Sequence, residues 1–147
     1  METKKLKLTI RRLQKEDYGE EFLRLLKQQD LKKIPSKKVF EHILKSANTI
    51  WVVALNKDNN QFVAMGTLLI EQKLLYGGTL AGYIEDIIVD KRYKQSDIGK
   101  DLVEAMVDTA KNMGCYKVGT HMQGAMTKTM EDMDFKKFSN YFYADFE

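Results

Sequence analysis

Residues 82–89, with the sequence GYIEDIIV, decide the fold of this chain. Apolar and β-branched residues dominate the run and predict a largely buried strand. A polar loop follows over residues 90–98, and apolar residues then recur every three or four positions over 99–113, which predicts a helix. Gly114 is expected to end that helix because glycine tolerates a left-handed backbone. A further strand is predicted over residues 116–122, so the order is strand, loop, helix, strand.

The rest of the chain predicts strands and helices that would complete one layered domain. Period-2 alternation and β-branched runs mark the strands, whereas apolar residues on one face mark the helices. The predicted strands cover residues 6–10, 50–55 and 62–70, and the predicted helices cover 16–27, a segment opening at Pro35 and Ser36, and 125–133. Aromatic residues over 135–146 predict one or two more strands. We therefore expect a single α+β domain over residues 1–147, with a mixed, mostly antiparallel sheet flanked by helices.

The composition is that of an ordinary globular domain. With 147 residues the chain is long enough to bury a core without a disulfide or a metal, and no metal site is predicted. The 24 basic and 21 acidic residues are mostly interspersed, and the lysine-rich clusters lack interleaved aromatic residues. Nucleic acid is therefore not an expected partner.

The number of cysteines and the hydropathy of the chain indicate the cellular compartment to expect. Cys115 is the single cysteine, which excludes an intramolecular disulfide and predicts a reducing compartment, cytoplasmic or nuclear. No run approaches about 18 uncharged apolar residues, the length that a membrane helix needs. Neither a signal peptide nor a membrane span is expected.

The order of elements, together with the strings IEDIIV (84–89) and GCYK (114–117), resembles the core of the GCN5-related N-acetyltransferases, the GNAT superfamily. Within it the chain resembles the glucosamine 6-phosphate N-acetyltransferase branch over residues 6–135, most strongly over 71–117. The resemblance implies the GNAT fold and acetyl-CoA as the co-substrate. It also implies a homodimer with active sites at the subunit interface, to which the C-terminal strands contribute.

The acetyl-CoA loop departs from the pattern of that family. By the resemblance, the coenzyme-binding residues are Ile87, Ile88, Val89, Lys94, Gln95, Ser96, Asp97, Ile98, Gly99 and Lys100. The family keeps Arg-Gly-x-Gly/Gln-x-Gly, and backbone N–H groups at a helix N-terminus hold the pyrophosphate. Here Gln95 replaces a glycine, and Asp97 adds a carboxylate that would repel phosphate. Ser96 and Asp97 are also preferred N-cap residues, and in that role they would occupy donors that a phosphate needs.

An acidic pair lies where the family contacts its amino sugar. Glu85 and Asp86 are both present, and the resemblance also assigns Lys117 to the substrate site. Side chains of adjacent strand residues point to opposite faces, so the two carboxylates cannot act as a paired acid and base. We expect one to face a cleft and the other to face solvent or an interface. The alternative, a pair that only aids solubility, is disfavoured because carboxylates are costly to bury in so apolar a strand.

The catalytic positions of the family are replaced. By the resemblance, His121 stands in place of an acidic residue, and Met130 in place of the tyrosine whose hydroxyl meets the coenzyme sulfur. Histidine can accept a proton near neutral pH, although a lone histidine is more often a packed or solvated residue. Methionine has no proton to donate. Met126, Thr129 and Met130 recur at helical spacing, which also describes the packed face of a core helix.

These replacements predict a diverged, catalytically inactive homologue with no cofactor, which uses the domain to form a homodimer or to bind a protein partner. The methionine-lined cleft and the sheet edge near Glu85 and Tyr116 are the expected partner surfaces. The alternative is an active, acetyl-CoA-dependent glucosamine 6-phosphate N-acetyltransferase with relocated catalytic groups.

Overall fold

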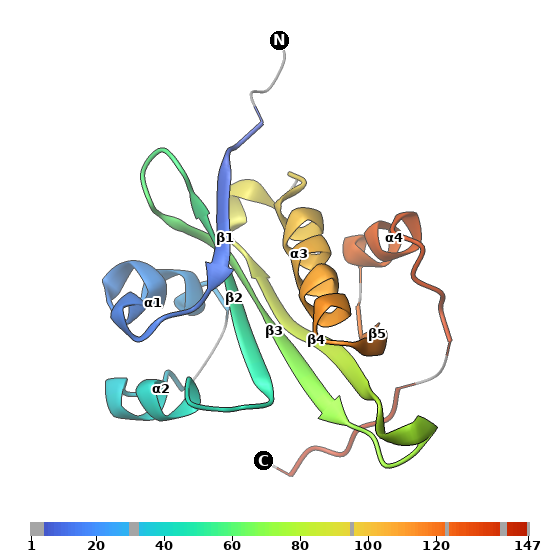
Figure 1. Cartoon of the computed structure of the whole chain (residues 1–147). Helices are drawn as coiled ribbons and strands as arrows, with labels where there is room; N and C mark the ends of the chain where they lie inside the picture. Colours follow the sequence, from blue (N-terminus) through green and yellow to red (C-terminus); the bar gives the residue numbers. More distant parts are fainter. Residues whose placement is uncertain (1–4, 30–32, 95, 123, 139–140, 147) are drawn as a thin grey trace.

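The computed structural model describes residues 5–29, 33–94, 96–122, 124–138 and 141–146. Within them, five strands form one sheet in the order β1-β2-β3-β4-β5 (Figure 1). The strands are β1 (Leu8–Arg12), β2 (Thr49–Asn56), β3 (Phe62–Gln72), β4 (Leu80–Val89) and β5 (Cys115–Thr120). The helices are α1 (Glu20–Lys27), α2 (Lys37–Ile43), α3 (Ile98–Asn112) and α4 (Ala125–Asp132), and short 3₁₀ turns lie at η1 (Lys15–Asp17), η2 (Tyr76–Gly78) and η3 (Lys91–Tyr93).

The sheet is mixed. Strands β1 to β4 pair antiparallel with their neighbours, whereas β4 and β5 pair in parallel. A parallel pair needs a crossover connection, and helix α3 supplies it. The mixed, mostly antiparallel sheet with flanking helices that the sequence predicts is therefore confirmed.

Helices cover both faces of this sheet (Figure 1). Helices α1 and α2 pack on one face through a buried cluster that includes Phe22 and Phe40. Helix α3 packs on the other face through a cluster that includes Leu102 and Met106. Alternate residues of β2 belong to the two clusters, as the period of a strand buried on both sides requires.

Gly66 in β3 allows α3 to lie close against the sheet. A Cβ atom at this position would lie 2.7 Å from Met106 Cε and 3.4 Å from Leu102 Cδ2. Both side chains are fully buried, so neither can move aside without disturbing a close-packed core.

A β-bulge in β4 lies opposite Gly66. The β3–β4 register shifts between Met65 and Thr67, where β4 contains one extra residue. Asp86 lies in this bulge with φ 53°, a left-handed backbone that is uncommon for a residue other than glycine.

The bulge changes which face of the sheet the following side chains of β4 point to. Ile84 belongs to the α3 cluster, whereas Ile88, four residues later, belongs to the α1–α2 cluster. Simple alternation, from which opposite orientations of Glu85 and Asp86 were predicted, does not hold across such a bulge. Both carboxylates are exposed, so the argument from their cost of burial does not apply either.

Helix boundaries follow local sequence signals. Ser36 caps α2 by accepting a hydrogen bond from the amide of Val39 at 3.3 Å, as predicted from the Pro-Ser pair. Gly114 follows α3 with φ 90°, which confirms the predicted end of that helix. Helix α1 begins at Glu20, later than predicted, because Gly19 before it has an extended backbone.

The aromatic C-terminal segment does not form the predicted strands. No strand occurs in the described residues between 135 and 146, and Phe138, Phe142 and Phe146 are 95%, 85% and 94% exposed. A strand requires a partner with which its backbone can pair, and within a single subunit this segment pairs with none of the described strands.

In the described part of the chain, no helix combines the length and the apolar character needed to cross a membrane. Nor does any group of three or more His, Cys, Asp or Glu side chains there offer a metal site.

Candidate functional site

The site is built around the point where β4 and β5 separate. Their pairing extends to Ile84 and Thr120, and the Thr120 hydroxyl donates a hydrogen bond of 2.8 Å to the carbonyl oxygen of Ile84. Beyond this pair the second half of β4 continues toward the start of α3 without β5 beside it. The strands therefore diverge after Ile84 and Thr120, next to Glu85.

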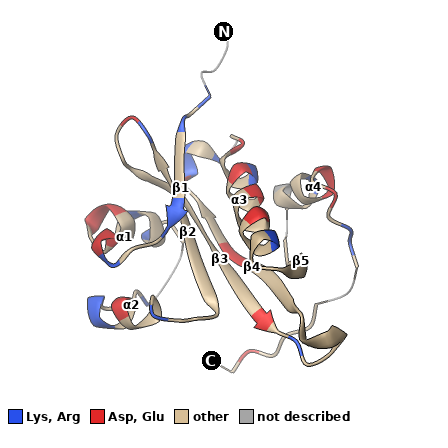
Figure 2. Ribbon diagram, viewed as in Figure 1, with Lys and Arg blue, Asp and Glu red and all other residues tan. Residues whose placement is uncertain are grey.

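The predicted coenzyme loop lies at the N-terminus of α3. Lys94, Ser96, Asp97 and Lys100 are exposed, whereas Ile98 and Gly99 are buried. Gln95 lies outside the described residues. Figure 2 shows the basic residues of η3 beside the start of α3. Phosphate oxygens of a coenzyme would meet cations here as well as the Asp97 carboxylate.

The cap of α3 differs from the prediction. Asp97 occupies the N-cap position but makes no side-chain capping bond, and its φ of −81° and ψ of 9° lie outside the extended region. A capping side chain normally needs an extended backbone. The Ser96 hydroxyl instead accepts a long hydrogen bond of 3.4 Å from the amide of Ile98.

The amides of Gly99 and Lys100 lie in the first turn of α3. No side chain among the described residues accepts a hydrogen bond from either amide. Unpaired amides in the first turn of a helix attract anions. The inference that capping has used up the phosphate donors is therefore wrong for these two amides, and Asp97 opposes an anion by its charge alone.

A buried ion cluster anchors the end of β4 next to this loop. Asp90 has no exposed side-chain surface and pairs with Arg92 at 2.8 Å and Arg24 of α1 at 2.9 Å. Hydrogen bonds from the Arg92 guanidinium and backbone amide, and then from Arg24, hold the pKa of Asp90 well below its usual range. Arg24 also donates to the carbonyl oxygen of Phe62 at 3.0 Å, so the cluster ties α1 to β3 and β4. Nothing in the sequence indicates that Arg24 pairs with Asp90.

Helix α4 carries methionine side chains at positions where the resemblance to the acetyltransferases implies polar groups. Met130 is only 5% exposed and belongs to the core cluster beneath α3. Met126 lies against Gly99, with its sulfur 3.4 Å from the position of a Gly99 Cβ and Val89 Cγ2 at 3.5 Å from the same point. No proton donor therefore occupies the inward-facing positions of Met126 and Met130.

His121, the candidate base, follows the end of β5 and is exposed. Its ring centroid lies 4.0 Å from that of Tyr141, which stacks in turn on Tyr143 at 6.1 Å. Sequence reasoning assigned no role to Tyr141, because nothing in the sequence brings it to His121. The structure thus places the ring of Tyr141 beside His121, the candidate base.

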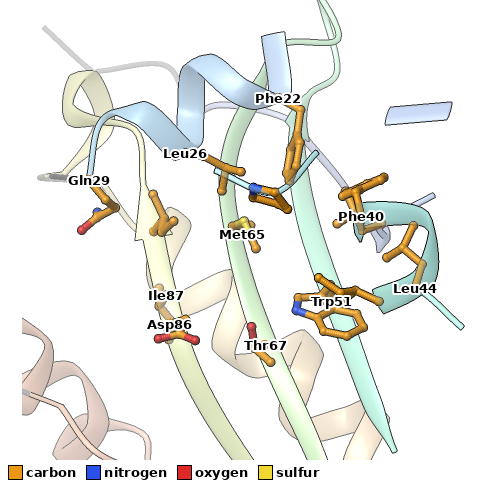
Figure 3. A pocket seen from close by; sticks show the side chains of 14 residues that line it. Phe22, Leu26, Gln29, Phe40, Leu44, Trp51, Met65, Thr67, Asp86 and Ile87 are labelled. Carbon is orange, nitrogen blue, oxygen red and sulfur yellow. The ribbon is translucent and has the colours of Figure 1, made fainter. Parts of the chain in front are cut away.

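A separate cavity of about 380 Å³ opens on the other face of the sheet, between α1, α2 and strands β2 to β4 (Figure 3). We call it the α1–α2 pocket. Its lining is mainly aromatic and aliphatic, and the described residues that line it include the polar side chains of Gln29, Thr67 and Asp86. Asp86, Thr67 and Trp51 lie in a row across β4, β3 and β2.

The predicted substrate residues are not all brought together. Asp86 lines the α1–α2 pocket, which agrees with the expectation that one member of the acidic pair faces a cleft, and Glu85 does not line it. Lys117 does not line it either, and its ammonium lies over the ring of Tyr116 at 5.5 Å.

Comparisons with known proteins agree with this geometry. The model of the acetyltransferase (GNAT) family matches residues 8–129. A relative from Oryza sativa subsp. japonica, named "Probable glucosamine 6-phosphate N-acetyltransferase 2", is 32% identical over 118 residues, which cover 74% of this chain and 70% of the relative. The crystal structure of glucosamine-6-phosphate N-acetyltransferase from Arabidopsis thaliana superposes with a TM-score of 0.86 at 27% identity, covering 96% of this chain and 99% of that one.

Some sequence matches are shorter. The Arabidopsis thaliana glucosamine 6-phosphate N-acetyltransferase is 43% identical over 60 residues, which cover 41% of this chain and 40% of the relative. Across three relatives, from Arabidopsis thaliana, Dictyostelium discoideum and Trypanosoma brucei brucei, the alignments span between 40% and 63% of the relative's own length.

Proposed function

The chain belongs to the GNAT family of acetyltransferases, in its glucosamine 6-phosphate N-acetyltransferase branch, and from this premise we propose that it is a diverged, catalytically inactive member that acts by binding. One observation carries this proposal. Met130 stands in place of the family tyrosine and is packed in the core at 5% exposure, so α4 has no acid there to protonate a departing thiolate.

The substrate side supports the same conclusion. Glucosamine 6-phosphate carries a phosphate, and proteins bind phosphate with arginine, lysine or clustered N–H donors. No Lys, Arg or His is among the described residues that line the α1–α2 pocket, and Asp86 there would repel an anion. This pocket does not suit a sugar phosphate.

Acetyl-CoA is the co-substrate of this family, and the chain fits it only in part. The amides of Gly99 and Lys100 are free of side-chain partners among the described residues and would bind the pyrophosphate. Asp97 and the methionines of α4 supply neither an anion site nor a proton. We infer weak coenzyme binding without useful turnover.

A thiol-release assay with acetyl-CoA and glucosamine 6-phosphate tests the proposal. Loss of a positioned proton donor typically lowers the rate by about 10²–10⁴-fold. We expect no release above background, with the Arabidopsis enzyme as the positive control. Turnover near about 1 s⁻¹, within the ordinary range of enzymes, would contradict inactivity.

The contact between His121 and Tyr141 favours a second candidate, an active acetyltransferase with relocated groups. In that reaction the amine nitrogen bonds to the acetyl carbon as the thioester C–S bond breaks. His121 would take the first proton of the ammonium group, and the Tyr141 phenol would protonate the thiolate and then recover a proton from the acylated nitrogen. If the assay detects turnover, this candidate predicts that His121→Ala and Tyr141→Phe each abolish most of it, whereas Tyr143→Phe does not.

We also propose that the chain forms a homodimer through its C-terminal aromatic segment and works in the cytoplasm or nucleus. Exposed Phe138, Phe142 and Phe146 form an apolar surface that a folded subunit would be expected to cover. Light scattering should give about twice the monomer mass of 17.1 kDa. A mass of one subunit at tens of micromolar protein would overturn this proposal, and a separate protein partner would then have to cover the segment.

A further inference from the structure

We propose that the outer face of helix α2 binds an acidic, amphipathic helix of a partner protein. This inference rests on the proposed binding function and deepens it, because it names the class of partner that the domain binds. We call this surface the α2 outer face and define it by its exposed side chains, which are Lys37, Lys38, Val39, His42, Ile43 and Lys45. Of these residues, only Ile43 also lines the α1–α2 pocket, so the surface is distinct from that cavity.

Helical spacing arranges the α2 outer face in two neighbouring rows. Val39 and Ile43 are four residues apart and are 48% and 36% exposed, so they form an apolar row. Lys38 and His42 have the same spacing and form a polar row beside it. Phe40, which is 4% exposed, holds the other side of the helix on the sheet. A partner helix with apolar side chains in one row and acidic side chains in the next would match both rows.

The charge of this face favours an acidic partner. Residues 36–46 include three lysines and one glutamate (Figure 2). None of the three lysines forms an ion pair with a residue that the structure describes. Lysines without a local counter-ion attract an acidic segment, and salt screens this attraction. Binding of the partner should therefore weaken as the ionic strength rises.

Two of these lysines do not stabilise the helix that carries them. The first turn of α2 contains no acidic residue and begins with Lys37 and Lys38. The N-terminal end of a helix has a partial positive charge, so cations there are unfavourable, whereas lysines at the C-terminal end are stabilising. Partner carboxylates beside these lysine side chains would offset part of that repulsion. Recognition is by the side chains, and binding should stabilise α2.

Two other anionic partners fit this face less well. Helices that bind a membrane surface present large aromatic or leucine side chains, whereas the exposed apolar residues of α2 are a valine and an isoleucine. Single-stranded nucleic acid is bound by stacking of bases on aromatic side chains, and the phenylalanine of α2 is buried. The observations therefore favour a protein segment.

A synthetic peptide of about 15 residues, long enough to form a helix when bound, is the probe. It carries leucine in one row at helical spacing and glutamate in the row beside it, and a comparison peptide carries glutamine in place of glutamate. Fluorescence anisotropy of the labelled peptides measures binding to the full chain. We expect a dissociation constant of about 100 μM or tighter for the acidic peptide at low salt, and at least about tenfold weaker binding of the glutamine peptide, which corresponds to about 1.4 kcal/mol.

Matched variants locate the binding surface. Lys37→Gln combined with Lys38→Gln should weaken binding of the acidic peptide about fivefold, and its urea midpoint should not fall, because glutamine is as good a helix former as lysine. The control combines Lys57→Gln with Lys128→Gln, which removes the same charge from exposed lysines outside α2 and should change the affinity less than about twofold. Val39→Thr keeps the side-chain shape but interrupts the apolar row, and it should weaken binding about threefold.

Several results would overturn this inference. They are equal binding of the acidic and glutamine peptides, equal weakening in the α2 variant and its control, or no peptide binding up to about 1 mM. Tighter binding of vesicles of phosphatidylserine and phosphatidylcholine in equal parts, or of a single-stranded RNA, than of the acidic peptide would also overturn it. The proposed inactivity fails separately. Thiol release from acetyl-CoA would contradict the inactivity and leave the assignment of the α2 outer face intact, whereas absence of peptide binding leaves the inactivity untouched.

Discussion

The two faces of the sheet differ in what occupies them. On the α3 face, Met126 of α4 packs against Gly99 and Met130 packs in the core, at positions where the resemblance to the family implies polar groups. On the α1–α2 face, a cavity remains open, and Asp86 lies at its edge with a strained backbone and a carboxylate that has no partner among the described residues. One face is therefore filled by packed thioethers, whereas the other keeps an open cavity with a charged edge.

Breaking the Asp90 cluster should strongly destabilise the fold, because this cluster ties α1 to β3 and to the end of β4. Asp90→Asn leaves Arg24 and Arg92 without their shared carboxylate. Loss of one partner of a fully buried pair costs about 3–5 kcal/mol, and we expect about 2–3 kcal/mol because both arginines are partly exposed. Urea unfolding measures this loss. The control is Asp101→Asn, whose distant pair with exposed Lys5 should contribute less than about 0.5 kcal/mol.

The same cluster predicts the acid sensitivity of the fold. The pKa of Asp90 is lowered on folding, so its contribution is complete above the pKa of an unfolded aspartate, about 3.9, and is lost as the pH falls toward the lower folded value. The wild type should therefore lose more stability than Asp90→Asn between about pH 5 and pH 2. If the unfolding free energies of the wild type and of Asp90→Asn change in parallel with pH, protonation of Asp90 is not linked to unfolding.

Side-chain truncations to alanine on the two faces of the sheet should lower the free energy of unfolding by different amounts. Met130→Ala would leave a cavity in a packed core and should cost about 2–4 kcal/mol. Ile43→Ala should cost less than about 1 kcal/mol, because Ile43 is 36% exposed and already borders a cavity. Urea midpoints with unchanged m values measure both. Equal losses would remove the distinction between a packed and an open face.

The smallest effect is expected at the coenzyme loop. Asp97→Asn removes an exposed carboxylate close to the free amides of Gly99 and Lys100, and it should tighten coenzyme A binding by up to about fivefold at low salt. Lys100→Gln should weaken it. Chemical shifts of the two amides during a coenzyme A titration measure both affinities. An unchanged affinity in Asp97→Asn would show that charge is not what opposes the coenzyme.

Much of the fold was predictable because it depends on local pattern. The strand, loop, helix and strand around residues 82–122 follow from periodicity and from Gly114, and the order of elements is confirmed. The aromatic pattern of residues 135–146 led to a wrong prediction of strands. A period-2 pattern predicts a half-buried strand but does not specify the strand with which it would pair.

The site was less predictable because it depends on register and on distant contacts. The bulge at Asp86 arises from pairing with β3 opposite Gly66, and no property of the residue itself reveals it. Arg24 meets Asp90 across 66 positions of sequence, and the α1–α2 pocket exists only once two helices pack on the sheet. The lack of a proton donor at Met130 follows from residue type alone, whereas its equivalence to the family tyrosine stays a prediction from the resemblance.

Calorimetry with acetyl-CoA at low salt tests the central claim most directly, because it examines the face that we infer to have lost its chemistry and requires no choice of acceptor. The Asp97 carboxylate and the methionine-lined face of α4 predict a dissociation constant of about 1 mM or weaker. Binding at about 1 μM would contradict the account and would favour an active acetyltransferase.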